Sequence, residues 1–481
     1  MNAISRQLVA RWARLGPRFL PFADVATAEI PLSRWLRLAL FQVSVGMALV
    51  LLVGTLNRVM IVELGVPASL VAVMVALPVL YAPFRTLIGF RSDTHRSALG
   101  WRRVPFIWMG TMIQFGGLAV MPFALLVLSG GGNAHAWPTW VGQAGAAAAF
   151  LFVGVGLHTT QTAGLALATD LAAEEARPRV VGLMYVMLLV GTIVAAFGFG
   201  AFLRDFTPGR LVQVIQAAAV LTLVLNSVAL WKQETRRPPR GAAAPPAPPN
   251  FGDAWREYIA PPGALRRLVA IGLGTFAFGM QDVLLEPYGG QVLGMGVGST
   301  TWLTATLALG GLIGFSLASV VLGRGFDAAR MARLGAWVGV PAFAAIIGAA
   351  TTLSLPLFVA GVFGIGFGGG LFGHGTLTVT MNRAPKEQTG LALGAWGAVQ
   401  ATSAGAAVAA GGLLRDAVAA FAQQGAFGAA MAGPAIGYVA VYAVEVALLF
   451  ATIAAMNSLV GAPAAGAGSM IRVPRAPGES A

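Results

Sequence analysis

Two histidines, His158 and His374, stand in apolar, glycine-rich stretches of the chain, and each precedes a threonine within two residues. A neutral imidazole can supply an axial nitrogen to the magnesium of a chlorophyll-type macrocycle, and neighbouring glycines let a flat ring lie close to a helix. Gln161 lies about one helical turn from His158 and is a third candidate. The alternative is that each histidine hydrogen-bonds a neighbouring helix and holds the bundle together.

The elements that must position these residues are membrane-spanning helices. Of the 481 residues, 57% are hydrophobic and 10% are charged, and the mean hydropathy is +0.77. No soluble fold of this size hides so much apolar surface. Runs of roughly 20 apolar residues, the length that crosses the hydrocarbon core, are predicted at twelve places. They are 36–56, 67–88, 104–128, 140–166, 180–202, 209–231, 266–285, 299–322, 335–354, 356–380, 388–412 and 434–458.

A short basic segment between the second and third runs is echoed in the second half of the chain. A glycine followed four residues later by an aspartate occurs in both places, which indicates an internal duplication. The residues are Gly89, Asp93, Gly100, Arg102 and Arg103 in the first copy, and Gly323 and Asp327 in the second.

The segment resembles the loop between helices 2 and 3 of major facilitator superfamily (MFS) transporters. That resemblance implies an all-α integral membrane fold of the MFS type, with about 12 helices in two pseudo-symmetric six-helix bundles.

Basic residues define the predicted topology and the division of the chain. All but four of the 31 Lys and Arg residues fall on one side of the membrane, which places both termini in the cytoplasm. A basic amphipathic segment, with a solvated arginine-rich lead-in as its alternative, precedes two bundles separated by a Pro/Ala-rich linker. The predicted limits are 1–35 for this segment, 36–231 for the first bundle, 232–264 for the linker, 265–458 for the second bundle and 459–481 for a cytoplasmic tail.

Polar residues close the equivalent spans 1 and 7 at the predicted periplasmic face. In transporters these helices line the central cavity, so the residues are candidates for substrate binding or gating. An interfacial ion pair between Arg58 and Glu63 is the local alternative. Glu445 is alone in the middle of span 12, where a carboxyl is expected to be protonated or paired across helices, and it is a candidate proton site. The cavity and gating candidates are Asn57, Arg58, Glu63, Gln281, Asp282 and Glu286.

Enzymatic and nucleic-acid functions are not expected. The sequence holds no HExxH, GxSxG or Walker-type motif. Glycines at 364, 366 and 368 lie inside an apolar run and not at a strand-to-helix turn, so they predict helix packing and not a dinucleotide site. Cysteine is absent, which excludes disulfides and thiolate metal sites, and no free metal is expected. The net charge of +13 reflects topology.

Several stretches resemble the PucC/LhaA family, the bacteriochlorophyll delivery family of the MFS. They are 29–34, 54–64, 81–85 together with the 89–103 loop, and 281–290, and the resemblance extends over about residues 29–458. The 281–290 stretch is the most specific, since ordinary sugar and drug transporters do not resemble it. The loop at 89–103 departs from the general transporter pattern by a longer insert between Asp93 and Gly100.

The resemblance implies a light-harvesting antenna assembly factor that binds (bacterio)chlorophyll and delivers it to nascent antenna subunits. LH1 is favoured over LH2 by the 89–103 loop. The implied partners are light-harvesting α/β polypeptides, the reaction centre–LH1 complex, chlorophyll-synthesis enzymes and membrane lipids, in a bacterial inner or intracytoplasmic photosynthetic membrane. The alternative is a proton-coupled transporter of a porphyrin-like or other amphiphilic molecule, resting on Asp282, Glu286 and Glu445.

Overall fold

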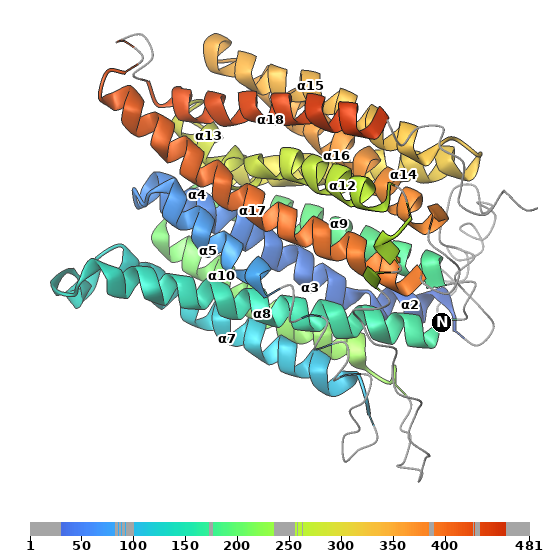
Figure 1. Cartoon of the computed structure of the whole chain (residues 1–481). Coiled ribbons are helices and arrows are strands. Elements are labelled where there is room, and N and C mark those ends of the chain that lie inside the picture. Colours follow the sequence, from blue (N-terminus) through green and yellow to red (C-terminus); the bar gives the residue numbers. More distant parts are fainter. Residues whose placement is uncertain are drawn as a thin grey trace, which may run out of the picture.

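The described part of the protein is a bundle of helices. The computed structural model describes residues 30–81, 85, 88, 92, 101–172, 177–234, 255–256, 258–261, 263–383, 389–426, 428 and 433–457. Every regular element in these residues is a helix, and the long helices lie side by side (Figure 1). Most of the predicted N-terminal segment, most of the linker and the predicted tail lie outside the described residues.

Span 1 consists of α2 (Leu32–Leu38), α3 (Leu40–Leu49), the π-helical η2 (Val50–Thr55), α4 (Leu56–Arg58) and the π-helical η3 (Val59–Glu63). The rest of the first half holds α5 (Ala68–Leu80), α7 (Val104–Leu128), η4 (Gly132–Ala136), α8 (Thr139–Leu171), α9 (Arg177–Phe202) and α10 (Pro208–Leu230). The second half holds α12 (Ala264–Gly279), η6 (Met280–Val283), α13 (Leu285–Gln291), α14 (Val297–Gly323), α15 (Ala328–Thr352), α16 (Leu355–Arg383), α17 (Thr389–Gln423) and α18 (Ala435–Asn457).

The all-α membrane fold predicted from hydropathy is confirmed. Within the described residues, 11 helical runs are long and apolar enough to cross a membrane, and a shorter apolar helix at Ala68–Pro78 occupies the predicted second span. Apolar runs become helices in lipid because each backbone polar group must find its partner inside its own segment. Span 1 runs from Leu32 to Glu63, seven residues beyond its predicted end, so Asn57, Arg58 and Glu63 belong to its last turns.

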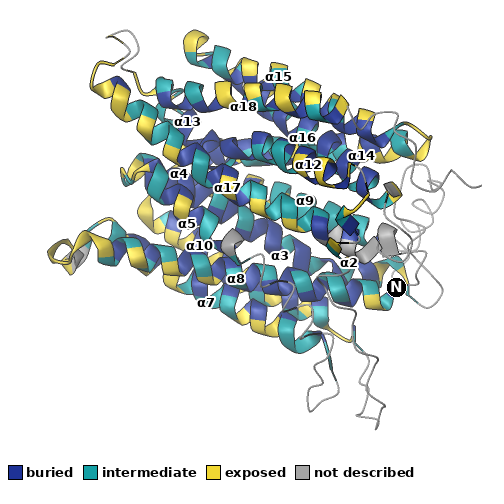
Figure 2. Ribbon diagram, viewed as in Figure 1, coloured by how far each residue is buried: buried dark blue, intermediate teal, exposed yellow. Residues whose placement is uncertain are grey.

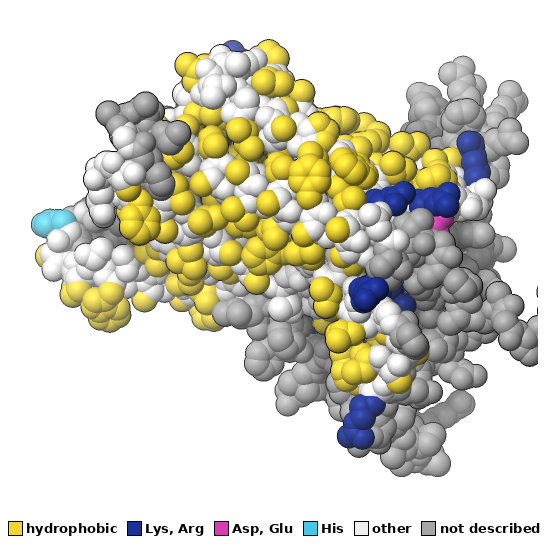
Figure 3. Space-filling model, turned by 45° about the horizontal axis from the view of Figure 1, so that its top comes forward, with side chains coloured by type: hydrophobic (Ala, Val, Ile, Leu, Met, Phe, Trp, Pro, Cys, Tyr) yellow, Lys and Arg dark blue, Asp and Glu magenta, His cyan; other side chains and the backbone are white. Residues whose placement is uncertain are grey.

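The outer faces of the bundle are apolar. Exposed residues lie along the outward faces of the helices (Figure 2), and many of them are large hydrophobic residues such as Phe123, Trp140 and Val194. In the view of Figure 3 the described Lys and Arg side chains gather mostly at one end of a broad apolar surface. We call this the basic end and the opposite end the far end. A lipid-facing belt with one basic end is the pattern that the positive-inside rule describes.

The two halves meet mainly at the far end. The principal contacts between them are α5 with α17, α9 with α14, and the last turns of span 1 with α13. Among the described residues, every hydrogen bond between the halves lies towards this end. These bonds join Thr55 to Thr301, Asn57 to the Val283 carbonyl, Arg58 to the Met295 carbonyl, Asp416 to the Ser69 amide, and Trp302 to the Phe197 carbonyl.

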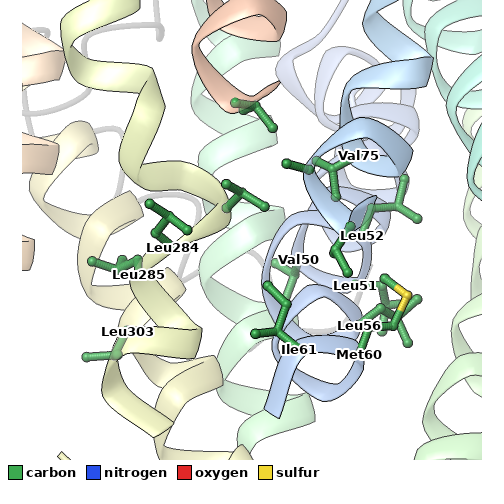
Figure 4. Close-up of a cluster of buried hydrophobic side chains, with 14 of the residues drawn as sticks. Val50, Leu51, Leu52, Leu56, Met60, Ile61, Val75, Leu284, Leu285 and Leu303 are labelled. Carbon is green, nitrogen blue, oxygen red and sulfur yellow. The ribbon is translucent and has the colours of Figure 1, made fainter. Parts of the chain in front are cut away.

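An apolar cluster fills the space beside these bonds. Figure 4 shows Ile61 of span 1 on the side that faces Leu284 and Leu285 of the seventh span, and Leu51 and Leu56 on the other side of span 1. All five are no more than 3% exposed and belong to one core that continues through both halves. We call the hydrogen bonds and this cluster together the joint.

Glycine lets several helix pairs approach closely. A Cβ on Gly366 of α16 would lie 2.0 Å from the carbonyl oxygen of Leu307 in α14. A Cβ on Gly368 would lie 2.7 Å from the carbonyl oxygen of Gly335 in α15. The glycine string at 364–368 therefore packs helices, as expected from its apolar setting.

We expect Gly366→Ala to lower the stability of the purified protein, because the new methyl group must push α14 and α16 apart. Gly373→Ala is the matched control on the same helix, since a Cβ there meets nothing within 4 Å. The control should be neutral or stabilising by about 0.5–1 kcal/mol, the helix preference for alanine. Thermal unfolding in mild detergent measures both, and equal midpoints for the two variants would contradict the close packing.

Candidate functional site

His158 lies in α8, partly exposed, and its imidazole has no hydrogen-bond partner. The Nδ1 atom is enclosed and unpartnered, whereas Nε2 is not enclosed and makes no hydrogen bond among the described residues. The backbone carbonyl of His158 accepts a hydrogen bond of 2.7 Å from the Thr162 hydroxyl. Nε2 is therefore the ring nitrogen with access to a ligand.

His374 occupies the equivalent span, α16, with different neighbours. Its ring meets Phe315 of α14 edge-on, with 4.2 Å between the ring centroids. Here too Nδ1 is enclosed without a partner and Nε2 is not enclosed. Each histidine lies within its own half, so the two define separate positions.

Each imidazole has an accessible nitrogen that could bind a magnesium macrocycle, but among the described residues neither has an acceptor that orients its ring. Within the described residues neither side chain makes the interhelical hydrogen bond that the packing alternative requires, and each has an accessible nitrogen. A ligating histidine usually also donates its other N–H to an acceptor that orients the ring. Neither Nδ1 atom has such an acceptor in the part of the chain that the structure describes, so the donor chemistry fits a chlorophyll-type group while the orientation rests on packing.

Gln161 belongs to a polar cluster that the sequence did not reveal. Its Oε1 accepts a hydrogen bond of 3.2 Å from Nη2 of Arg85, and its Nε2 donates one of 3.3 Å to Oε1 of Gln42. Nε of Arg85 donates to the Thr162 hydroxyl at 3.0 Å. Arg85 also lies close enough to His158 to interact with it electrostatically. The Gln161 amide is thus held by Arg85 and Gln42.

The seventh span is interrupted, and Glu445 caps the interruption. The helix α12 ends at Gly279, a 3-10 turn follows at Met280–Val283, and α13 resumes at Leu285. Oε1 of Glu445, a fully buried residue of α18, accepts a hydrogen bond of 2.7 Å from the backbone N–H of Gln281. On the other side, Nδ2 of Asn57 donates to the Val283 carbonyl at 2.7 Å. Spans 12 and 1 therefore satisfy backbone groups near the break.

Two of the remaining gating candidates, Glu286 and Arg58, lie at the joint. Glu286 is 2% exposed, accepts a hydrogen bond from the Thr304 hydroxyl and faces Gly54 of span 1, where a Cβ would lie 2.3 Å from its Oε1. Asp282 accepts from the side chain of Gln281. Arg58 forms the ion pair with Glu63 and also donates to the Met295 carbonyl of the other half at 3.1 Å.

The loop residues at the basic end are also engaged structurally. Gly323 ends α14, and the Asp327 carboxylate caps α15 by accepting from the Arg330 amide at 2.7 Å. In the first copy, Gly89, Asp93 and Gly100 lie outside the described residues.

Glu234 performs the capping at the start of the third span. Its carboxylate accepts hydrogen bonds of 2.6–3.2 Å from the backbone N–H groups of Arg102, Arg103 and Val104, which begin α7. Arg103 is 4% exposed and pairs with Asp170 at 2.9 Å, because the end of α8 supplies a carboxylate beside it.

A cavity of about 710 Å³ lies at the basic end, away from both histidines. The start of α7 and the end of α10 line it, with the tryptophans at 101, 108 and 231 around its rim. Tryptophan at this level of a membrane protein is common, since its ring suits the headgroup region.

We expect Glu445→Gln to leave the fold intact and Glu445→Leu to destabilise it. The glutamine carbonyl can still accept from the Gln281 amide, whereas leucine leaves that buried N–H unpaired, at a cost of about 1–3 kcal/mol. Thermal unfolding of the three proteins in detergent provides the comparison. If Glu445→Gln unfolded as readily as Glu445→Leu, the role of the carboxylate as a backbone cap would be rejected.

Solved membrane transporters share this arrangement of helices. A bacterial homologue of the human lysosomal transporter Spinster, in an inward-facing and unoccupied conformation, matches with a TM-score of 0.66 at 17% identity, covering 88% of this chain and 95% of that one. The nucleoside transporter NupG matches with a TM-score of 0.63 at 12% identity, over 89% of this chain and 100% of that one. The protein is therefore an all-helical membrane protein with the major facilitator fold.

The sequence comparisons define the family. A family model described as PUCC protein matches residues 55–464. Protein PucC of Rhodovulum sulfidophilum is 62% identical over 87% of this chain and 92% of its own length. Protein PucC of Cereibacter sphaeroides is 58% identical over 94% of this chain and 96% of its own length. This chain belongs to the PucC family, which is linked to the assembly of light-harvesting complexes.

A more distant relative carries a name of its own. The Bacteriochlorophyll synthase 44.5 kDa chain of Rhodobacter capsulatus is 28% identical over 77% of this chain and 84% of its own length.

Proposed function

We propose that this protein binds (bacterio)chlorophyll within the membrane and delivers it to antenna polypeptides while they assemble, without catalysing a reaction. The observation that carries the proposal is that His158 and His374 each keep an accessible ring nitrogen inside a member of the PucC family. The name of the Bacteriochlorophyll synthase relative supports the same pigment. LH1 is the proposed recipient, as the 89–103 segment favours, and α/β polypeptides, the reaction centre–LH1 complex and pigment-synthesis enzymes are the proposed partners.

The surroundings of His158 and His374 indicate what each could contribute to pigment binding. The bound pigment would supply a magnesium that takes one axial ligand, and Nε2 of His158 or His374 would provide it. Phe315 holds the His374 ring from one side, which limits its rotation. His158 lies instead beside the Arg85 cluster, so its ligand would meet polar groups as well. The two positions therefore differ in what else they can hold.

The proposed setting is a bacterial photosynthetic membrane with the basic end in the cytoplasm. The clustering of Lys and Arg at one end supports this orientation (Figure 3). The apolar outer faces would also give antenna helices a surface within the bilayer.

We expect the double variant His158→Ala with His374→Ala, made in pigmented cells, to co-purify with at least roughly tenfold less bacteriochlorophyll than the parent protein, as a lost ligand bond predicts. His135→Ala is the matched control, because His135 is exposed on the short helix η4 that precedes α8. Pigment and antenna subunits are quantified per mole of protein after mild detergent extraction, with LH1 and LH2 polypeptides distinguished by mass.

Unchanged pigment content in the double variant would refute the histidine assignment. Parent protein free of any chlorin and of any antenna subunit would refute the proposed function. Loss of the variant protein from the membrane, with unchanged pigment per remaining molecule, would support the packing alternative.

Proton-coupled transport of an amphiphile is the second candidate, and the shared transporter fold favours it. Two of the residues that would couple protons already have structural roles, since Glu445 caps the seventh span and Glu286 is enclosed in the joint. Uptake into proteoliposomes under a pH gradient tests it. Uptake that requires the gradient and is lost in Glu445→Gln would favour transport over the assembly role.

A further inference from the structure

Arg85 is a partly buried cation whose described partners are all neutral. Its Nε and Nη2 donate to the Thr162 hydroxyl and to Oε1 of Gln161, and Nη1 has no partner among the described residues. Gln161 lies ten residues before the end of α8, which places the cluster roughly 15 Å inside that helix end.

Three other arginines with little exposure pair with a carboxylate, whereas the half-buried Arg34 bonds Gln233, which is neutral. Arg58 pairs with Glu63, Arg103 with Asp170, and Arg415 with Asp416. Arg267, in the first turn of α12, instead lies over the ring of Tyr258 at 5.9 Å. Arg85 has no carboxylate among its described contacts, and Tyr185 of α9 lies close enough to interact with it electrostatically.

The spans around Arg85 offer no spare carboxylate. The described parts of spans 1, 2, 4 and 5 contain only Glu63 and Asp170, and both are already paired with other arginines. An unpaired charge at this depth is expensive and usually marks a functional site. The counter-charge is therefore expected to come from a ligand.

Two hydrogen-bond donors in this cluster have no acceptor among the described residues. Nη1 of Arg85 is free to donate, and Nε2 of the fully buried Gln42 has no partner. Gln161 links them, because it accepts from Arg85 and donates to Gln42. One positive charge with nearby amide donors suits a single carboxylate. A phosphate monoester would bring about one negative charge too many into a poorly hydrated place.

We propose that Arg85, Gln161 and Gln42 bind the carboxylate of an amphipathic ligand, and that this ligand is a tetrapyrrole with a free, unesterified carboxylate. The second part rests on the proposed function, since it uses the open nitrogen of His158 one turn from Gln161. A flat macrocycle held at His158 would place its acidic side chain towards Arg85. The reaction class that would consume such a ligand is esterification of that carboxylate.

The test uses magnesium-free probes, so that binding does not depend on a histidine–metal bond. Binding of pheophorbide a, which has a free carboxylate, and of its methyl ester is measured with the purified full-length protein in detergent. The parent protein should bind the acid at least roughly tenfold more tightly than the ester, as a charge-assisted hydrogen bond predicts. Arg85→Gln should remove this preference and leave the affinity for the ester unchanged.

Controls keep the result independent of folding. Arg333→Gln, at a side chain that bonds Asn457 near the basic end of the other half, should behave as the parent. Gln42→Met, which keeps volume and removes the amide, should weaken binding of the acid severalfold while the ester is unaffected. This second variant decides the matter if Arg85→Gln does not fold.

Equal affinity for acid and ester in the parent, or a preference that survives both substitutions, overturns the carboxylate site. If oleate displaces the acid at equal concentration, the site holds a fatty acid and the tetrapyrrole assignment is overturned. If the parent protein prefers the acid but never co-purifies with pigment, the proposed function alone is refuted. If the parent protein co-purifies with pigment but shows no preference for the acid, only the carboxylate site is refuted.

Discussion

The break in the seventh span is the constraint on which the rest of the structure depends. A helix interrupted inside a membrane exposes backbone groups that lipid cannot satisfy, so the protein must supply partners. Glu445 supplies one from span 12 and Asn57 supplies another from span 1. Because Asn57 belongs to the first half and Glu445 to the second, the hydrogen bonds that satisfy the break also join the two halves. The ion pair of Arg58 and the enclosed Glu286 then complete a joint at the far end.

The polar residues of the spans fall into two kinds that look alike in the sequence, those that belong to the joint or the break and those that do not. Asn57, Arg58, Glu286 and Glu445 hold backbone and neighbouring side chains, and their hydrogen bonds account for their presence in an apolar protein. His158, His374 and Arg85 are different, since neither histidine ring makes a hydrogen bond among the described residues and Arg85 bonds neutral side chains there. A histidine stands in each of two equivalent spans, but one lies near Arg85 and the other against a phenylalanine ring. The protein therefore combines a fixed scaffold with a few unsatisfied positions.

Hydropathy was sufficient to predict the twelve spans, because the length and apolarity of a membrane helix are local properties. Side-chain partners were not predictable in the same way. Glu445 meets Gln281 across 164 positions, and Arg85 meets Gln161 across 76, so nothing near either residue in the sequence indicates its partner. Asp327 is an instructive intermediate case. It was interpreted as a family motif, yet an aspartate directly before a helix is a local capping signal, and capping is the role it has.

A structure of the protein extracted from pigmented membranes would show whether the open imidazole nitrogens hold the pigment. We expect a chlorin whose magnesium is bonded to Nε2 of His158 or of His374, while the Glu445 and Asn57 contacts to the seventh span stay as they are here. Pigment found only on the lipid-facing surface, with both imidazoles unligated, would contradict it.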